Sequence, residues 1–298
     1  MKMKRSEKLG MFTGLVVGVL LLLISVFMIF QTTCKVWGAE KLANATQQGI
    51  DVSSHQGKID WEQVKNSALA DYAIIRCGYG VNQTDKDDKY WDYNSSECER
   101  LGIPYGTYLY SGADTTAKAK SEAEHVVRLL QGKNLTYPIY YDMEADMLNQ
   151  LSSTQIGNIA KTFLNTMESY GYKNVAVYSN KYLFETKLTA SVFSDYPKWI
   201  AQHSNKCTYR GSYHMWQYST QGVIPGISEK VDLNYKIGNW TYAGYSPAKK
   251  PVVAKPKATT IKSLKKSGKK AVKITYKKVS GVSGYQIYMS TKKKLGYK

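Results

Sequence analysis

Residues 137–146 read YPIYYDMEAD, an apolar, aromatic run that ends in two acids, Asp142 and Glu144. Its first part, Tyr137–Tyr141, predicts a buried strand because aromatic residues dominate it. Side chains two residues apart on a strand share a face, with Cα atoms about 6.6 Å apart. Two carboxylates held this close repel each other, so the arrangement costs stability unless it has a use. The alternative is an ordinary acidic surface turn after a strand end.

Helical and extended periodicities alternate on both sides of this segment. Thr115–Leu130 before it and Ser153–Tyr170 after it place apolar residues at helical spacing. Further helices are expected over residues 61–65, 89–101 and 181–187, and strands over residues 49–53, 72–78, 104–110, 137–141, 174–178, 198–201, 213–217 and 231–234. Strands separated by helices indicate parallel pairing through crossovers. We therefore predict an α/β fold, a TIM-like barrel of eight strands in which the last helices are missing.

The acids fall where such a barrel places its working residues, at the carboxyl ends of strands. Asp51 in GIDVSSHQGKIDW (residues 49–61) and Asp232 in KVDLNY (residues 230–235) occupy similar positions to Asp142 and Glu144. One acid between apolar residues is ordinarily an exposed edge position, but four acids beside aromatic rings indicate a sugar-binding cleft. Rings stack on the apolar faces of pyranoses, while acids bind hydroxyls and transfer protons. The aromatic residues near these strand ends are Tyr79, Tyr110, Tyr141, Tyr178, Trp199 and Trp216.

The motifs follow an order that resembles a known family. GIDVSSHQGKIDW, YAIIRCGYG, YPIYYDMEAD, KWIAQ, WQYS and VDLNY occur in the order seen in glycoside hydrolase family 25, the Chalaropsis-type lysozymes. The resemblance runs from about Gln48 to Tyr242. It implies an irregular eight-stranded barrel with about five helices and three closing strands. It also implies action on bacterial peptidoglycan, at the β-1,4 bond from N-acetylmuramic acid to N-acetylglucosamine.

By this resemblance Glu144 corresponds to the general acid, Asp142 to its partner, and Asp51 and Asp232 to two further cleft acids. An acid that acts near neutral pH needs a raised pKa, and we expect the neighbouring Asp142 carboxylate to raise that of Glu144 by like-charge repulsion. Asp142 is then expected to be ionised. It either attacks the anomeric carbon or stabilises the substrate's own 2-acetamido group as that group attacks, and both routes retain configuration. The alternative functions are a chitinase-like or N-acetylglucosaminidase activity, and a non-catalytic wall-binding protein.

Several other residues carry smaller expectations. Arg76 is expected either to pair with a cleft acid or to form an ion pair at the strand edge. His55 and His203 have no partner at catalytic spacing and are expected at the surface. The sequence contains no metal-ligand spacing and no phosphate-binding glycine loop, so neither a metal nor a cofactor is expected. The expected substrate contacts are Tyr79, Tyr110, Tyr178, Trp199, Gln202, Trp216 and Gln217, with the two glutamines bound to N-acetyl groups.

The N-terminal residues 1–40 predict an export signal or a membrane anchor. A basic leader, MKMKRSEKLG, precedes the uncharged and mostly apolar residues 11–30, a length that fits a membrane span. Whether the segment is cleaved or retained, we expect the barrel to be extracellular or associated with the cell wall. Cys77, Cys98 and Cys207 are expected to be free thiols, with a Cys77–Cys98 bridge as the alternative.

Positive charge is concentrated at the other end of the chain. Residues 246–298 contain 16 lysines and no acid. We expect a catalytic barrel over residues 47–243, a Pro/Lys-rich linker over 244–258, and over 259–298 a β segment that resembles the beginning of a fibronectin type III domain cut short. The tail is expected to meet an anionic cell-wall or membrane surface, or to be a solvated face without a partner. The nearly neutral barrel argues against binding to nucleic acid, and a monomer is expected.

Overall fold

The computed structural model describes residues 44–240, 259–267 and 271–278. The chain divides into two compact units, Met1–Pro247 and Ala248–Lys298. The expected export segment, the expected linker and residues 279–298 of the expected β segment lie outside the described residues. Among the described residues, no helix has the length and apolar composition needed to cross a membrane.

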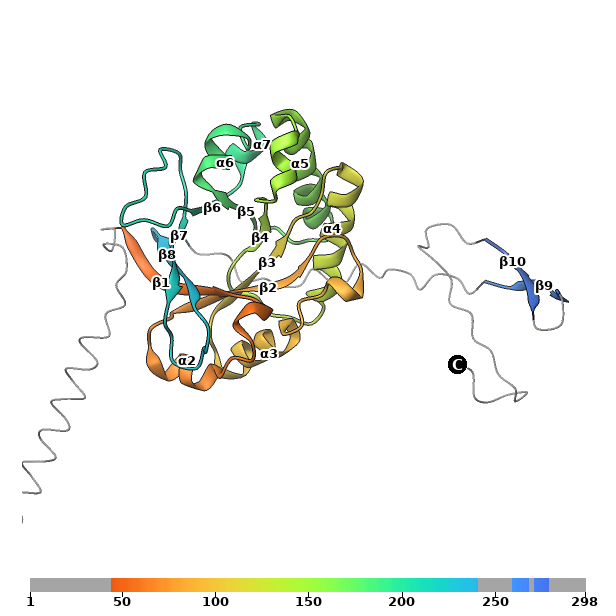
Figure 1. Ribbon diagram of the computed structural model, residues 1–298, viewed down its shortest axis with the longest axis horizontal. Coiled ribbons are helices and arrows are strands. Elements are labelled where there is room, and N and C mark those ends of the chain that lie inside the picture. The colour runs from red at the N-terminus through yellow and green to blue at the C-terminus, as the bar shows by residue number, and fades with distance from the viewer. Residues whose placement is uncertain (1–43, 241–258, 268–270, 279–298) are drawn as a thin grey trace, which may run out of the picture. The chain divides into compact units, whose positions relative to one another are not determined.

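Eight strands of the first unit close into a barrel, in chain order from β1 to β8 (Figure 1). Neighbouring strands from β1 to β7 pair in parallel. Every strand expected from the sequence is present, which confirms the α/β, TIM-like barrel. The strands are β1 (Ala45–Val52), β2 (Tyr72–Tyr79), β3 (Tyr105–Tyr110), β4 (Ile139–Asp142), β5 (Val175–Asn180), β6 (Lys198–Ala201), β7 (Met215–Gly222) and β8 (Val231–Ile237).

The described residues contain six α-helices, which lie around the outside of the barrel (Figure 1). The expectation that the helices end at Lys187 is wrong, because Val192–Asp195 form a further turn before β6. A helix of one turn has too few residues to show a helical period in the sequence. The helices are α2 (Trp61–Ser67), α3 (Trp91–Leu101), α4 (Thr116–Leu129), α5 (Ser153–Ser169), α6 (Lys181–Thr186) and α7 (Val192–Asp195), with 3₁₀ turns η1 (Ser54–Gln56), η2 (Thr84–Lys86) and η3 (Asp146–Gln150).

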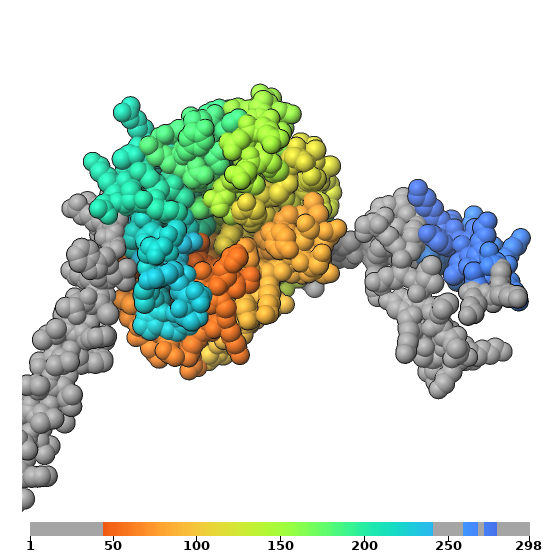
Figure 2. All heavy atoms as spheres, viewed as in Figure 1, coloured from red at the N-terminus to blue at the C-terminus, as the bar shows by residue number. Residues whose placement is uncertain are grey.

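The last strand departs from the parallel order. β8 runs antiparallel to both β7 and β1 and so closes the barrel. Only residues 223–230 connect β7 to β8, and a parallel crossover needs about a dozen residues or more, so the chain returns as a hairpin. In Figure 2 the beginning and the end of the barrel segment, coloured orange and cyan, lie against each other. This closure brings residues of β1 and β8 to the same part of the barrel.

The alternation of side chains along the strands divides the apolar residues between two clusters. One cluster contains Tyr140, Tyr178 and Trp199, whereas their neighbours Tyr141 and Ile200 belong to a larger cluster that also contains helix residues. Because the larger cluster includes the helices, it lies outside the barrel, and the smaller cluster fills the interior. The inward positions near the carboxyl ends of the strands are therefore where polar side chains can face an opening.

The second unit is a pair of antiparallel strands, β9 (Ile261–Lys266) and β10 (Val272–Tyr276). The large apolar side chains of Ile261, Leu264 and Val272 are exposed on it. A short all-β segment at the C-terminal end is thus confirmed. Its resemblance to a fibronectin type III domain stays a prediction.

Cys77, Cys98 and Cys207 are free thiols, as expected, and the alternative bridge between Cys77 and Cys98 is not formed. Both of these cysteines are buried, and burial raises the pKa of Cys77 to about 12. A buried thiol of such high pKa holds its proton, so it is a poor nucleophile. The two cysteines act as small apolar core residues.

Candidate active site

Asp51 and Asp232 meet because β1 and β8 pair. They are Cα partners in the antiparallel register of these strands. Like charges directly opposite each other on paired strands repel, so this pair favours a state in which one carboxyl group keeps a proton. Burial and then the charge of Asp51 raise the pKa of Asp232 to about 8. Asp232 therefore keeps a proton more readily than a hydrated aspartate does.

Two amide side chains donate hydrogen bonds to Asp51. Asn234 Nδ2 and Gln217 Nε2 donate to Asp51 Oδ2 over 2.7 and 2.9 Å. Asn234 is itself fixed by Trp199, whose Nε1 donates to Asn234 Oδ1 over 2.8 Å. Burial raises the pKa of Asp51, and the hydrogen bonds from the two amides oppose this rise. The amides thus favour the ionised form of Asp51 and determine its orientation.

Asp142 is the last residue of β4 and is only 2% exposed. Its Oδ1 atom has no hydrogen-bond partner among the described residues. Burial and then the charges of Glu144 and Asp51 hold the pKa of Asp142 well above its usual range, while Arg76 opposes this rise. A buried polar atom left unsatisfied costs about 1–3 kcal/mol. Oδ1 of Asp142 is therefore a buried acceptor that the described residues leave unsatisfied.

Glu144 lies just beyond the end of β4 and is half-buried. Burial and then the charge of Asp51 raise its pKa, while the charge of His203 and a hydrogen bond with Tyr178 oppose this rise. The raised pKa agrees in direction with the sequence-based expectation, but its largest cause is loss of hydration rather than repulsion by Asp142. Asp142, which we expected to be ionised, also has a raised pKa. The raised pKa values thus favour a state in which the four carboxyl groups of this cluster are not all ionised at once.

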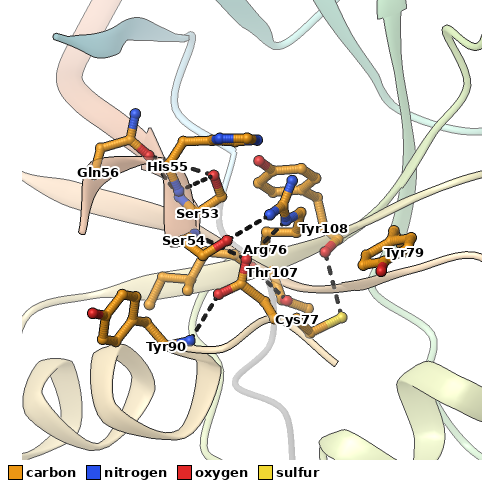
Figure 3. A network of polar contacts seen from close by, with 12 residues as sticks. Ser53, Ser54, His55, Gln56, Arg76, Cys77, Tyr79, Tyr90, Thr107 and Tyr108 are labelled. Atoms are coloured by element: carbon orange, nitrogen blue, oxygen red, sulfur yellow. Dashed lines mark hydrogen bonds and ion pairs between the residues drawn. The ribbon is translucent and has the colours of Figure 1, made fainter. Parts of the chain in front are cut away.

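Arg76 supplies positive charge near this cluster without touching an acid of the cleft. Its Nε pairs with Asp88 Oδ2 over 2.8 Å, and its Nη2 donates to Ser54 Oγ over 2.9 Å (Figure 3). Asp88 also accepts a hydrogen bond from the backbone N–H of Ser54 over 2.9 Å. Of the two expectations for Arg76, the ion pair outside the cleft is the one observed. Through these contacts with Ser54, Arg76 and Asp88 link the turn after β1 to strand β2.

Tyr178, Trp199 and Tyr110 lie on the inward face of the barrel, where Trp199 is only 1% exposed and packs in the inner cluster. The rings of Tyr178 and Trp199 lie 4.4 Å apart between centroids. Tyr110 ends β3 as the Cα partner of Asp142, and burial together with the charges of Asp142 and Glu144 raises its pKa. The remaining expected aromatic contact, the residue Tyr79, ends β2 and is 42% exposed. Three strands therefore present tyrosines at the end of the barrel that holds the acids.

Three of the expected side chains point elsewhere. Trp216 and Tyr141 are fully buried in the outer apolar cluster, and Trp216 is on the opposite face of β7 from Gln217. The amide of Gln202 is occupied by Thr208, because it donates to Oγ1 over 3.0 Å and accepts from the backbone N–H over 2.9 Å. We therefore do not include these three residues in the cleft proposed below.

Asn234 and His203 are site residues that the sequence interpretation missed. Asn234 is two residues after Asp232, and the period-2 alternation of a strand could have placed both on one face. His203 is exposed, as expected, but its Nε2 lies 2.9 Å from Gln217 Oε1. Its position two residues beyond the carboxyl end of β6 could have indicated that it lies near the site. His55 is exposed on η1, as expected.

The cluster can donate a proton from one carboxyl group and stabilise positive charge with another. Its members come from β1, β4, the loop after β4, and β8, and tyrosines lie beside them. The described part of the chain contains no group of His, Cys, Asp and Glu side chains suited to hold a metal ion. This combination of acids and aromatic rings suits hydrolysis of a glycosidic bond.

Comparison with known proteins agrees with this chemistry. The sequence model of the Glycosyl hydrolases family 25 matches residues 50–227. The autolytic lysozyme of Clostridium acetobutylicum is 30% identical over 188 residues, which cover 63% of this chain and 55% of that protein. Lysozyme M1 of Streptomyces globisporus is 28% identical over 201 residues, which cover 63% of this chain and 66% of that protein.

Solved structures show the same barrel. The modular autolysin LytC from Streptococcus pneumoniae, in complex with a synthetic peptidoglycan ligand, superposes with a TM-score of 0.58 and 33% identity. The superposition covers 63% of this chain and 46% of LytC. The chain thus spans about half the length of the autolytic lysozyme and of LytC.

Proposed function

The chain belongs to glycosyl hydrolase family 25, and we propose that it is a lysozyme, which cleaves the β-1,4 bond from N-acetylmuramic acid to N-acetylglucosamine in bacterial peptidoglycan. The observation that carries this proposal is the gathering of Asp51, Asp142, Glu144 and Asp232 at one end of the barrel. Relatives named as lysozymes, and the peptidoglycan ligand in the LytC structure, support the choice of substrate.

Glu144 is the general acid of the proposed reaction. Its pKa is raised, so it keeps a proton nearer to neutral pH than a hydrated glutamate does. It gives this proton to the glycosidic oxygen, and the bond between that oxygen and the anomeric carbon breaks with its electron pair left on the oxygen. Glu144 is only partly buried, whereas Asp142 is buried.

Asp142 stabilises the intermediate. The oxygen of the substrate's 2-acetamido group attacks the anomeric carbon, and its N–H gains positive charge as the ring forms. The acceptor that we propose for that N–H is Asp142, whose Oδ1 atom has no partner among the described residues. Water then attacks the anomeric carbon and gives a proton to the Glu144 carboxylate, while the bond from that carbon to the acetamido oxygen breaks with its electron pair left on the acetamido group. Two inversions at the anomeric carbon retain its configuration.

The substitution Glu144→Gln tests the assignment of the acid. We expect it to lower the rate of release of soluble fragments from purified cell walls by about 10²–10⁴-fold, because the amide cannot donate the proton. Glu168→Gln is the matched control, since Glu168 is exposed at the end of α5 and its side chain bonds Tyr196. Undiminished lysis by the Glu144 variant would contradict the assignment.

The new reducing end of the fragments identifies the bond. We expect N-acetylmuramic acid at that end when the intact protein digests peptidoglycan, as mass spectrometry of reduced fragments will show. Fragments that end in N-acetylglucosamine would instead support the glucosaminidase alternative. No released fragments at all, from folded protein, would support a wall-binding protein without activity.

We also propose that the barrel works outside the cell, with the lysine-rich residues 246–298 against an anionic wall or membrane surface. The described lysines of β9 and β10 are exposed, as are those beside them. Residues 246–298 contain no acid. No neighbouring carboxylate therefore offsets the attraction between these lysines and an anionic polymer.

A further inference from the structure

Gln217 has polar neighbours at both polar atoms of its amide. Its Nε2 donates to Asp51 Oδ2 over 2.9 Å and to Asp232 Oδ2 over 3.5 Å. Its Oε1 accepts from the Tyr178 hydroxyl over 3.0 Å and lies 2.9 Å from His203 Nε2. A glutamine amide offers two donors and two lone pairs, and here each of its two polar atoms has two neighbours within 3.5 Å. Gln217, an expected substrate contact, is instead occupied within the protein.

These partners also determine which way the amide points. The carboxylate of Asp51 can only accept, so the NH₂ group of Gln217 must face β1. Its oxygen must then face Tyr178 on β5. The Tyr178 hydroxyl has one proton and two neighbouring acceptors, Gln217 Oε1 and the Glu144 carboxyl group. While that proton is on Gln217, it cannot be donated to Glu144.

We propose that Gln217 is a positioning residue that helps to keep the proton on Glu144, by competing for the single proton of the Tyr178 hydroxyl. A hydroxyl that donates to a carboxylate stabilises the ionised form. Because Gln217 competes for this donor, Glu144 stays protonated to a higher pH than it would if Tyr178 donated to Glu144 alone. The inference rests on the proposed role of Glu144 as general acid, and it assigns Gln217 no contact with substrate.

Other groups also face Glu144, and the test must separate them from the Tyr178 proton. They are Asp51 on β1, Tyr110 on β3, Asp142 on β4, His203 after β6 and Asp232 on β8, with Arg76 of β2 acting on Asp142. Loss of Gln217 changes the surroundings of Asp51, Asp232 and His203 as well. Only the contribution of Tyr178 disappears when its hydroxyl is removed.

Four variants form the experiment: Gln217→Leu, Tyr178→Phe, the double variant and Gln217→Glu. In Gln217→Leu the Tyr178 hydroxyl can donate its proton only to Glu144. We therefore expect the pKa of the alkaline limb of the kcat/KM profile on solubilised peptidoglycan to fall by about one unit. Tyr178→Phe alone does not lower the pKa of this limb, because it removes the hydroxyl that can donate to Glu144. In the double variant the pKa of the alkaline limb no longer falls. Gln217→Glu does not lower this pKa either, because it keeps an acceptor for the Tyr178 hydroxyl.

A second readout does not depend on activity. Titration of ¹³C-labelled glutamate carboxyl groups by NMR, with Glu144→Gln to assign the signal, measures the pKa of Glu144 in each variant. We expect the same pattern, a fall in Gln217→Leu that Tyr178→Phe reverses. A fall that persists in the double variant, or no fall in a folded Gln217→Leu protein, overturns the proposal. If the parent protein is inactive while the NMR pattern holds, the lysozyme assignment fails and the role of Gln217 stands.

Discussion

Each of the four carboxyl groups at the site loses hydration when the barrel forms. The two acids one residue apart in YPIYYDMEAD led us to expect that repulsion between Asp142 and Glu144 raises one pKa. Burial is instead the largest cause of the raised pKa in all four acids. Repulsion adds to it across strands, chiefly through Asp51. The protonation of Glu144 therefore depends on residues from β1 and β5 as much as on its neighbour in sequence.

Raised carboxyl pKa values cost stability as pH rises. An unfolded aspartate ionises near pH 4, whereas Asp232 in the folded protein holds its proton to a pKa of about 8. Between these values the unfolded state binds fewer protons than the folded state, so the free energy of unfolding falls as pH increases. The cost is absent near pH 4 and complete above pH 8.

We expect Asp232→Asn to stabilise the protein at pH 8 by at least about 1–2 kcal/mol, because it removes part of this cost. The gain should shrink toward zero near pH 4, as measured by denaturant unfolding at several pH values. Asp195→Asn serves as the control, since Asp195 is exposed at the end of α7. A gain that does not change with pH would contradict the explanation.

At the scale of elements, the ends of α2 and α3 show a contrast in backbone strain. Ala68 follows α2 in the left-handed conformation, with φ 53°, and among the described residues other than glycine it alone has positive φ. Gly102 follows α3 in the same conformation, with φ 65°. A left-handed residue costs about 1 kcal/mol when it carries a Cβ atom. The two positions therefore differ in strain but not in geometry.

Reciprocal substitutions test this contrast. We expect Ala68→Gly to raise the free energy of unfolding and Gly102→Ala to lower it, each by about 1 kcal/mol or slightly less. A Cβ atom at Gly102 would meet no other atom within 4 Å, so its effect is one of backbone conformation alone. Equal signs for the two changes would contradict this account. Thermal and urea unfolding measure both.

The elements themselves follow closely from periodicity in the sequence. Strands and helices of the barrel lie within a few residues of the expected ranges, because buried strands are apolar runs and α4 and α5 show a helical apolar stripe. The direction of β8 did not follow from its own residues, because alternation is the same in parallel and antiparallel strands. It follows from the short connection after β7.

For the whole molecule, positive charge and the proposed catalytic acids lie on different parts of the chain. The barrel segment is nearly neutral, and the lysines of residues 246–298 have no acids among them. We expect deletion of residues 246–298 to weaken sedimentation with purified cell walls at low salt. Because attraction between exposed charges is screened by salt, the difference should be largely lost near 1 M salt. Unchanged binding at low salt would remove the proposed role of the tail.

Apolar periodicity and motif order are local properties of the chain, so they were enough to predict the barrel, the family and the four acids. How those acids affect one another follows instead from the closed barrel. Asp51 meets Asp232 through the register of β1 with β8, and Gln217 reaches Tyr178 from another strand. Hydration, charge and hydrogen-bond direction depend on distances in space, which residues far apart in the sequence acquire only when the barrel closes.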